Sequence, residues 1–294
     1  MFNFLHNFSP SPILVQIGFL KIHWYGLLIA LGAFSGFLIV LYLAKQYGLK
    51  KDDIYNLAFY LIIFGLIGDR LYYVFYAWNY YSKNLLDIFK IWEGGLAIHG
   101  AMIAGFLVIY IYGQKMKISP WLLADLVVVA LALAMAIGRW GNYFNQELFG
   151  RPTALPWGIP ILAEKRPPEF MTDNFFHPTF LYESLGNLLI FIILLAWHKI
   201  RLAKNISQRL TSPWLENKNL ESIQGLGNIA LVYLILYSVE RFCLEFLRID
   251  YSPYFLGLRW AQIFSILIIF ICLIIFLAKI IYKKTKALRS GQSF

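Results

Sequence analysis

Long apolar segments alternate with short polar connections along almost the whole chain. Seven such segments lie near residues 24–44, 54–77, 97–114, 121–138, 178–198, 225–247 and 258–281. Each has about 17–25 residues, the length that crosses roughly 30 Å of hydrocarbon. Because backbone groups in lipid must be paired within their own segment, all seven are predicted to be helices. The pattern predicts an all-α polytopic membrane protein with about seven transmembrane helices, forming a single membrane-embedded domain over residues 1–294.

The composition also indicates that lipid is the main solvent. Hydrophobic residues make up 60% of the chain and charged residues 14%, and the mean hydropathy is +0.62. A soluble globular domain is about 45–50% apolar and about 25% charged. The net charge of +10 would suit nucleic acid, but the basic residues lie in connections between apolar segments. Membrane lipid and topology explain them better, so no nucleic-acid partner is expected.

The basic residues of the connections predict the orientation, because Lys and Arg are enriched on the cytoplasmic side of a membrane. The richer side comprises the connections at 45–51, 115–117, 199–218 and 279–289. The other side has fewer basic residues, and several of these belong to polar clusters described below. We therefore expect the N-terminus outside and the C-terminus in the cytoplasm.

Two outer connections are predicted to be more than turns. Segment 139–177 is rich in proline, which cannot continue a helix, and is expected to form a shaped head region. Segment 78–96 mixes charges with aromatic residues, which are Trp78, Tyr80, Tyr81 and Trp92. Such a composition is typical of an arm that lies in the membrane interface.

Ionisable residues occur in or at the ends of the apolar segments, at Asp69, Arg70, Asp125, Glu183, Glu240, Arg241 and Glu245. Each would cost about 2.5–3.5 kcal/mol at the centre of a bilayer. Such residues persist where they pair with each other, line a wet cavity or carry out a function. For Asp69, Arg70 and Asp125, a structural role in holding helices together is as plausible as a functional one.

The densest polar run follows the fourth segment, at residues 138–151 (GRWGNYFNQELFGR). Arg139 and Arg151 provide two guanidiniums, whose rigid fork suits phosphate. Asn142, Asn145 and Glu147 add amides and a carboxylate, and interspersed glycines permit close backbone approach. The run is therefore a candidate site for a phospholipid head group. The alternative is a polar helix end that leads into a loop.

A second constellation lies on the sixth segment. Tyr237, Arg241, Glu245 and Arg248 are spaced four, four and three residues apart. On one continuous helix they would form a single polar stripe within an arc of about 80°. This stripe could present a second arginine to phosphate, or it could be a structural ion pair.

Three single sites are weaker. Tyr25 is at the outer end of the first segment, His99 lies among glycines, and His177 precedes Pro178 at the start of the fifth segment. Taken alone, each is more often structural than functional. Cys243 and Cys272 both fall inside apolar segments and are predicted to be core residues. No disulfide is expected, and without metal-ligand spacing no metal or other cofactor is expected.

Together, these segments resemble the phosphatidylglycerol–prolipoprotein diacylglyceryl transferase family. The matching motifs are Tyr25-Gly26, Gly94-Gly95 with His99-Gly100, the run 138–151, His177-Pro178 with Leu181-Tyr182-Glu183, and Arg241-Phe242 with Glu245-Phe246 and Arg248. They cover most of the chain in order, and the run 138–151 is the most specific.

The resemblance implies a bacterial inner-membrane enzyme with two substrates, phosphatidylglycerol and a prolipoprotein whose signal peptide ends at a lipobox cysteine. The cysteine sulfur would displace glycerol phosphate and form a thioether, the first step of lipoprotein maturation. The resemblance also implies a periplasmic N-terminus, which agrees with the distribution of basic residues.

The resemblance also assigns roles to the candidate residues. Arg139 and Arg241 would neutralise the departing phosphate. The thiol proton would go to Glu147, Glu245 or His99, which the sequence cannot rank. Tyr25 and Asn142 would position the lipid head group, and Gly150 would allow close approach to it. The remaining residues expected at the lipid site are Asn145, His177, Tyr237 and Arg248.

Two other functions compete with this interpretation. A lipid transporter or flippase would also carry charges inside the membrane and a broken segment near 138–150. Against it, no paired halves are evident, and the polar clusters crowd toward one side of the membrane. A lipid-binding scaffold without turnover is the third possibility.

Overall fold

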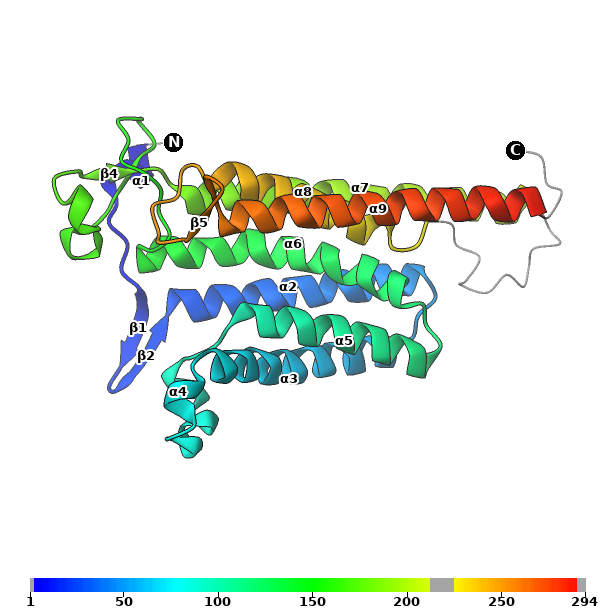
Figure 1. The fold of residues 1–294 in the computed structure, drawn as a ribbon, viewed down its shortest axis with the longest axis horizontal. Helices are drawn as coiled ribbons and strands as arrows, with labels where there is room; N and C mark the ends of the chain where they lie inside the picture. The colour runs from blue at the N-terminus through cyan, green and yellow to red at the C-terminus, as the bar shows by residue number, and fades with distance from the viewer. Residues whose placement is uncertain (1–2, 212–224, 290–294) are drawn as a thin grey trace. The chain divides into compact units, whose positions relative to one another are not determined.

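The computed structural model describes residues 3–211 and 225–289. Most of them lie in helices, and long helices cover all the predicted apolar segments (Figure 1). These are α2 (Trp24–Gln46), α3 (Lys51–Tyr76), α5 (Ile98–Met116), α6 (Pro120–Asn145), α7 (Thr179–Thr211), α8 (Asn228–Leu244) and α9 (Trp260–Arg289). Lys218, from the basic connection at 199–218, is outside the described residues.

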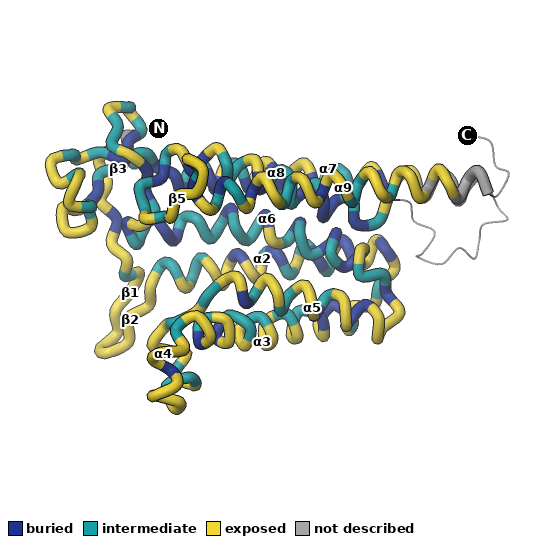
Figure 2. The backbone as a smooth tube through the Cα atoms, viewed as in Figure 1, coloured by how far each residue is buried: buried dark blue, intermediate teal, exposed yellow. Residues whose placement is uncertain are grey.

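Five of the described helices are long and apolar enough to cross a membrane: α2, α3, α6, α7 and α9. Many apolar side chains of α2, α3 and α9 are exposed in the protein itself, whereas α6 and α7 are more buried, with 44% and 39% of the residues buried in their most apolar stretches. In the most apolar stretch of α9, 11% of the residues are buried, and in that of α3, 17%. Figure 2 shows the exposed positions along α3 and α9. Such surfaces need lipid as their solvent, so the chain is a polytopic membrane protein.

The connections contain short elements as well as loops. Among the described residues, three two-stranded antiparallel sheets pair β1 (Ile13–Ile17) with β2 (Leu20–His23), β3 (Ile159–Pro160) with β4 (Phe175–Phe176), and β5 (Tyr254–Phe255) with β6 (Leu258–Arg259). Short helices are α1 (Asn3–Asn7), α4 (Trp78–Tyr81), η1 (Leu85–Phe89), η2 (Ile91–Glu93), η3 (Ala163–Lys165) and η4 (Pro168–Phe170). The all-α prediction therefore holds for the long segments, whereas the connections pair some backbone groups between strands.

Two predicted helix ends were wrong. The fourth segment was expected to end at residue 138, but α6 continues to Asn145, so Arg139 and Asn142 are helical. The sixth was expected to reach residue 247, but α8 ends at Leu244. There, the chain tightens through bonds from Phe246 N to Cys243 O and from Leu247 N to Leu244 O. Such three-residue spacing closes the last turn of many helices.

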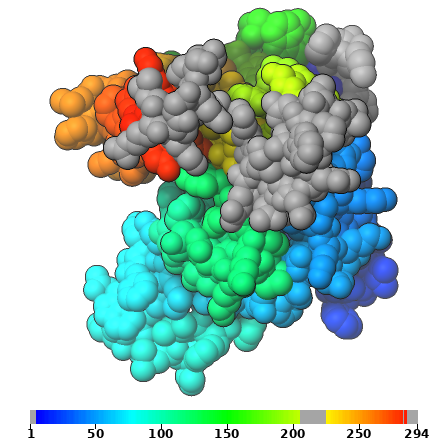
Figure 3. Space-filling model, turned by 90° about the vertical axis from the view of Figure 1, so that its right-hand side faces the viewer, coloured from blue at the N-terminus to red at the C-terminus, as the bar shows by residue number. Residues whose placement is uncertain are grey.

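The described chain forms two compact units. One comprises residues 40–127 and the described part of 202–227; the other comprises the rest, including 128–201 and 228–289. In the first unit, α3 packs along α5. Its core contains Leu57, Val108, Tyr112, Ile118 and Leu123. Gly68 and Gly100 let these helices touch, because a Cβ on Gly100 would lie 2.0 Å from the Gly68 carbonyl oxygen. The connections 47–50 and 117–119 lie at the same end of this unit (Figures 1 and 3).

Arg70, near the end of α3, holds the arm formed by residues 78–96. Its guanidinium donates to five backbone carbonyl groups, those of Asp87, Ile88, Lys90, Gly94 and Gly95, at 2.5–3.3 Å. It also lies over the ring of Tyr81, 5.2 Å from its centroid. Gly95 has φ +73°, and a Cβ there would lie 2.5 Å from an Arg70 nitrogen. Of its two possible roles, Arg70 therefore has the structural one.

Asp69 and Asp125 also bind backbone groups of this unit. The Asp69 carboxylate accepts a bond from the amide of Ala101 in the first turn of α5, at 3.3 Å. The Asp125 carboxylate accepts one from the Gly227 amide at 2.8 Å. Each acid thus satisfies a backbone donor near a helix start, which offsets part of the cost of placing it there.

Replacing Arg70 with glutamine is expected to loosen the arm. The variant loses several charge-assisted bonds, each worth about 1.5–3 kcal/mol, so trypsin should cleave at Lys83 or Lys90 at least about tenfold faster. The cleavage rate of the purified protein in detergent measures this. Arg70→Lys keeps the charge but not the fork and should be intermediate. Equal cleavage of Arg70→Gln and the unchanged protein would refute the role.

The second unit contains the ends of helices that carry the candidate site. Small residues bring α2 close to α6, since a Cβ on Gly32 or Gly36 would lie 2.9 Å from the carbonyl oxygen of Ala134 or Ala130. α8 packs along α9. The head region between α6 and α7 has an apolar core that includes Tyr143, Phe149, Ile159, Ile161, Phe176 and Phe180. This core fixes the C-terminal end of α6 and the N-terminal end of α7 relative to each other.

Candidate active site

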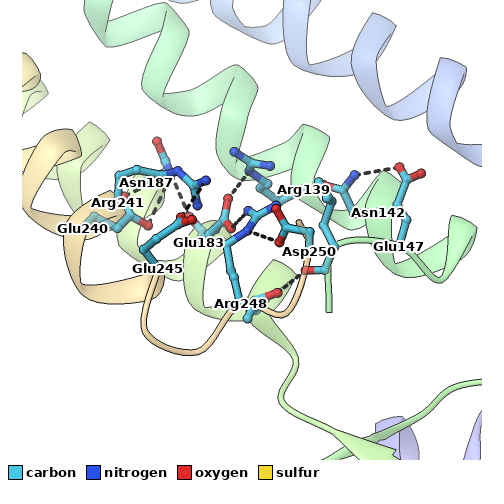
Figure 4. A network of polar contacts seen from close by, with 12 residues as sticks. Arg139, Asn142, Glu147, Glu183, Asn187, Glu240, Arg241, Glu245, Arg248 and Asp250 are labelled. Carbon is cyan, nitrogen blue, oxygen red and sulfur yellow. Dashed lines mark hydrogen bonds and ion pairs between the residues drawn. The ribbon is translucent and has the colours of Figure 1, made fainter. Parts of the chain in front are cut away.

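Charged side chains from three helices and one connection meet in a single network (Figure 4). Arg139 comes from the end of α6, Glu183 from the start of α7 and Arg241 from α8. Residues 245–259, between α8 and α9, contribute the rest, which are Glu245, Arg248, Asp250 and Arg259. Helix ends far apart in the sequence thus converge at one place.

Glu183 joins two of the arginines. Its Oε2 is 2.6 Å from Nε of Arg139, and its Oε1 is 3.1 Å from Nη1 of Arg248. The Glu183 side chain is 5% exposed, as is that of Arg248. A buried carboxylate shared by two guanidiniums holds both in fixed positions.

Glu245 pairs with two other arginines, Arg241 and Arg259. Its Oε2 is 2.8 Å from Nη2 of Arg241, and its Oε1 is 3.1 Å from Nε of Arg259. Arg259 also donates to the backbone carbonyl groups of Glu245, Arg248 and Asp250. The Arg241–Glu245 pair predicted from helical spacing is therefore present, and Arg259 anchors its acidic member.

Arg248 enters this network after α8 has ended. Its Nε lies 2.7 Å from Oδ1 of Asp250. Burial raises the pKa of Asp250, but the hydrogen bond from Arg248 and the charges of Arg248 and Arg259 outweigh it, so the pKa lies below its ordinary value. Burial alone would lower the pKa of Arg248, but its bond to Asp250 and the neighbouring carboxylates raise it. Both groups therefore stay ionised at neutral pH.

The guanidiniums of Arg139 and Arg241 both have N–H groups without partners among the described residues. Nη1 of Arg241 is buried and has no hydrogen-bond partner among the described residues. Arg139 is engaged through Nε, while its Nη groups have no partner in the described part of the chain. In Figure 4, both guanidiniums lie beside the carboxylate of Glu183. The unpartnered Nη1 of Arg241 is buried, and a buried donor without an acceptor is costly. The arrangement therefore suits an anion that supplies the missing acceptor.

The net charge of the ion-paired groups also favours an anionic ligand. Arg139, Arg241, Arg248 and Arg259 pair with the three carboxylates of Glu183, Glu245 and Asp250. The paired groups therefore carry one excess positive charge, equal and opposite to that of one phosphodiester. The nearby Glu240 carboxyl accepts its hydrogen bonds from the amide of Asn187, at 3.2 and 3.4 Å.

Asn142 and Glu147 form a neighbouring polar group. Asn142 is buried and donates to Oε1 of Glu147 at 2.8 Å, and Asn145 donates to the same oxygen at 3.4 Å. Glu147 is exposed and lines a cavity of about 300 Å³ together with Lys165 and Asp250. α6 ends here because Gln146 and Leu148 adopt left-handed backbone, at φ 50° and 54°. This strained backbone turns Glu147 back toward Asn142.

Tyr25 packs on the same stretch of α6. A Cβ on Gly141 would lie 2.5 Å from the Tyr25 ring, so glycine is required for this contact. The neighbouring Trp24 stacks on Phe144, with ring centroids 4.5 Å apart. The Tyr25 hydroxyl has no hydrogen-bond partner among the residues described. Tyr25 is thus held beside Asn142 with its hydroxyl available.

A family comparison identifies the chain. A sequence model of the prolipoprotein diacylglyceryl transferase family matches residues 12–278. The chain belongs to this family. Three similar proteins are each named phosphatidylglycerol–prolipoprotein diacylglyceryl transferase. That of Nostoc sp. is 42% identical over 259 residues, covering 88% of this chain and 85% of the relative. That of Thermosynechococcus vestitus is 40% identical over 262 residues, covering 89% of each. That of Fervidobacterium nodosum is 40% identical over 277 residues, covering 92% and 87%.

In this diacylglyceryl transferase, Gly150 and His177 contact the protein's own chain. The Gly150 amide donates to the His177 carbonyl at 2.9 Å, and a Cβ on Gly150 would lie 2.8 Å from that of His177. The His177 ring lies 3.2 Å from the Tyr182 hydroxyl, and burial lowers its pKa. The close approach that Gly150 permits is therefore to the head region itself. Lipid binding by either residue stays a prediction.

The other two predicted residues are placed less directly. Tyr237 stacks on Tyr233 in α8, with ring centroids 5.9 Å apart. His99 belongs to the other unit, where it is exposed and stacks on Tyr72, with centroids 5.5 Å apart. Its participation with Arg139 and Arg241 stays a prediction.

Sequence reasoning missed part of this transferase's network. The sequence marks Glu183 as an ionisable residue without assigning it to the site, and it assigns no site role to Asp250 or Arg259. Glu183 had one signal, because a carboxylate in the first turns of an apolar helix needs a partner. Arg259 had none, because its ion pair with Glu245 depends on the fold of the intervening connection.

The cysteines correct one expectation. Cys272 is buried as predicted, but Cys243 is exposed. It lies on α8, where an exposed apolar side chain can face lipid. Within the described ranges, no group of three or more His, Cys, Asp or Glu residues could hold a metal.

Proposed function

We propose that this chain transfers the diacylglyceryl group of phosphatidylglycerol to the cysteine thiol of a prolipoprotein, the activity for which its relatives are named. The observation that supports this most is the pair of guanidiniums, Arg139 and Arg241. Each is held by a buried carboxylate and keeps nitrogens that have no partner among the described residues. A phosphodiester has one negative charge and two free oxygens that accept from such nitrogens. The excess positive charge of the network suits a single lipid head group.

The reaction is a displacement at carbon. The cysteine sulfur forms a bond to the glyceryl carbon that bears the phosphate, and the carbon–oxygen bond breaks. Its electron pair stays on the phosphate oxygen, giving a thioether and glycerol phosphate. Negative charge grows on the phosphate as the bond breaks, so Arg139 and Arg241 stabilise the transition state more than the ground state.

The thiol must lose its proton, because its ordinary pKa is about 8.5 and the thiolate is the nucleophile. Glu147 is our first candidate for the base that accepts the thiol proton. Its carboxylate is exposed at a cavity and accepts hydrogen bonds from two amides. Glu245 is a poorer base, because each of its oxygens lies beside a guanidinium. His99 is the second candidate.

The remaining site residues have positioning roles in this proposal. Glu183 and Glu245 orient Arg139 and Arg241, and Arg248 holds Glu183 from its other side. Asn142, with Glu147, and the hydroxyl of Tyr25 would bind the head-group glycerol. Tyr237, Asn145, His177 and Gly150 would line or shape the same site.

We also propose seven membrane-spanning helices, with the N-terminus in the periplasm and the C-terminus in the cytoplasm of a bacterial inner membrane. α5 and α8 would complete the set. Their 19 and 17 residues correspond to about 28 and 26 Å of helix. Each packs along a helix that is apolar enough to span, α3 or α9. The segment 139–177 would then be the periplasmic head and 78–96 an interfacial arm, both within one membrane domain.

The purified protein, incubated with labelled phosphatidylglycerol and a lipobox peptide, tests the function. Transfer predicts a thioether-linked product, whereas a flippase would move lipid without product and a scaffold would bind it.

Asn142→Ala is expected to lower the transfer rate by about 10²-fold, because the buried amide that orients Glu147 is lost.

Asn174→Ala is the matched control, because Asn174 is an exposed asparagine of the head region. Its rate should stay within about twofold of the unchanged protein, as for most surface substitutions. No thioether product from the unchanged protein would refute the function. Equal rates for Asn142→Ala and Asn174→Ala would refute the role of Asn142 alone.

A further inference from the structure

A cavity of about 520 Å³ lies beside the network, in the connecting segments. Its charged lining residues are Arg151, Glu169, Arg248, Asp250 and Arg259. They belong to the head region and to the connection between α8 and α9, and none lies in a long helix. The cavity is therefore outside the membrane-spanning segments, where a water-soluble molecule can reach it.

The inner wall of this cavity is part of the ion-pair network. Arg248 lines the cavity and pairs with Glu183, which also pairs with Arg139. Arg259 lines it as well and pairs with Glu245, the partner of Arg241. One carboxylate therefore separates each cavity arginine from an arginine of the proposed lipid site.

Arg151 lines the cavity without an ion-pair partner among the described residues. Its backbone is fixed, because its amide donates to the Leu247 carbonyl at 2.8 Å and its carbonyl accepts from the His177 amide at 3.0 Å. Its side chain is exposed, and its guanidinium has no ion-pair or hydrogen-bond partner in the part of the chain described. A residue whose backbone is held in place and whose guanidinium has unused donors is suited to bind an anion.

The proposed reaction produces such an anion. Glycerol phosphate is a phosphate monoester, whose second pKa is about 6, so it carries nearly two negative charges at pH 7. Unlike the lipid substrate, it has no apolar part and must leave through water. Arginine side chains that line its path from the site to water would attract the dianion and lower the barrier to the departure of glycerol phosphate.

We propose that this cavity is the release site for glycerol phosphate, with Arg151 as its terminal anion receptor. The inference rests on the proposed function, since that reaction supplies the product. Glu169 lines the same cavity, is exposed and carries the opposite charge. Its carboxylate should weaken the binding of the same anion. Removing the charge of Arg151 should therefore weaken glycerol phosphate binding, and removing that of Glu169 should strengthen it.

Product inhibition tests the site. Initial rates of thioether formation are measured with increasing glycerol phosphate, and its inhibition constant Ki is compared with KM for phosphatidylglycerol. In Arg151→Gln, the ratio of Ki to KM should rise about tenfold, as expected for one lost charge-assisted bond. In Arg151→Lys it should rise less. In Glu169→Gln it should fall about twofold, the usual effect of one exposed charge.

Lys21→Gln is the control for the loss of one positive charge, because Lys21 is exposed in β2. Its ratio should stay unchanged. An unchanged ratio in both Arg151→Gln and Glu169→Gln would overturn the proposal. So would equal rises in Ki and KM in Arg151→Gln, which would assign Arg151 to the lipid head group.

Failure of the proposed function would look different, because the unchanged protein would then form no thioether product. Equilibrium dialysis with radiolabelled glycerol phosphate tests the cavity without turnover. The unchanged protein should bind it about tenfold more tightly than Arg151→Gln. Equal binding by the two proteins would overturn the proposal even if transfer is observed.

Discussion

Replacing Arg139 with alanine is expected to lower kcat/KM for diacylglyceryl transfer by about 10²–10³-fold, the usual cost of losing one preorganised donor to a developing oxyanion. Nε of Arg139 lies 2.6 Å from Glu183, while its Nη groups have no partner among the described residues. The guanidinium is therefore fixed at one edge and available at the other. Initial rates of thioether formation with purified protein measure the effect.

Two further variants separate charge from geometry. Arg139→Lys keeps the charge but loses the fork, so its rate should be intermediate. Arg166→Ala removes an arginine that donates to the carbonyl groups of Ile161 and Met171 within the head region. Its kcat/KM per folded molecule should stay within about threefold. A rate for Arg139→Ala equal to that of Arg166→Ala would remove Arg139 from the proposed site.

Replacing Glu183 with alanine is expected to have the largest effect on stability. The change leaves Arg139 and Arg248 without their shared carboxylate. Removing one partner from a buried ion pair costs about 3–5 kcal/mol, because the remaining charge is buried and unpaired. The midpoint of thermal unfolding in detergent should therefore fall well below that of the unchanged protein, and transfer should fall with it because Arg139 loses its orientation.

The control is Glu164→Ala, because Glu164 is exposed in the same head region. Its stability should change by less than about 0.5 kcal/mol, as for most surface substitutions. Glu183→Gln keeps the shape of the side chain and two polar atoms, so it should be less damaging than alanine. If Glu183→Ala unfolds at the same temperature as Glu164→Ala, then Glu183 does not hold the two arginines.

The extension of α6 shows how packing overrides a local signal. The fourth apolar segment ends at residue 138, where the polar run begins, and Gly138 and Gly141 are poor helix formers, since glycine costs about 1 kcal/mol in a helix interior. In the structure the helix continues through both, because Gly141 gives Tyr25 the room to pack on it. Arg139 and Asn142 consequently stand on a rigid helix rather than in a loop, which suits residues that must be preorganised.

The end of α8 illustrates the opposite case. Four residues at helical spacing predicted one continuous stripe, yet α8 stops at Leu244. Arg241 and Glu245 still meet, because the bond from Glu245 N to Arg241 O continues the helical pattern by one residue. Arg248 reaches Glu183 from the following turn instead. Periodicity identified the right residues, whereas the route by which Arg248 arrives depends on the turn.

The amino-acid pattern was enough to place the long helices, to indicate that lipid is their solvent, and to single out the unusual polar runs. Segment length and hydropathy are local properties, so they can be read without knowing any contact. The run 138–151 and the pair Arg241–Glu245 were recognisable for the same reason, because each is contained within a few helical turns.

The tertiary structure was needed to show which carboxylate pairs with which guanidinium. Glu183 joins Arg139 to Arg248, and Arg259 anchors Glu245, across connections whose course no local pattern encodes. It also decided that Arg70 binds the arm, and that Arg151 lines a cavity with no partner for its guanidinium in the described part of the chain. Ion pairs form between side chains that packing brings together, and packing depends on the whole set of helix contacts rather than on any one segment.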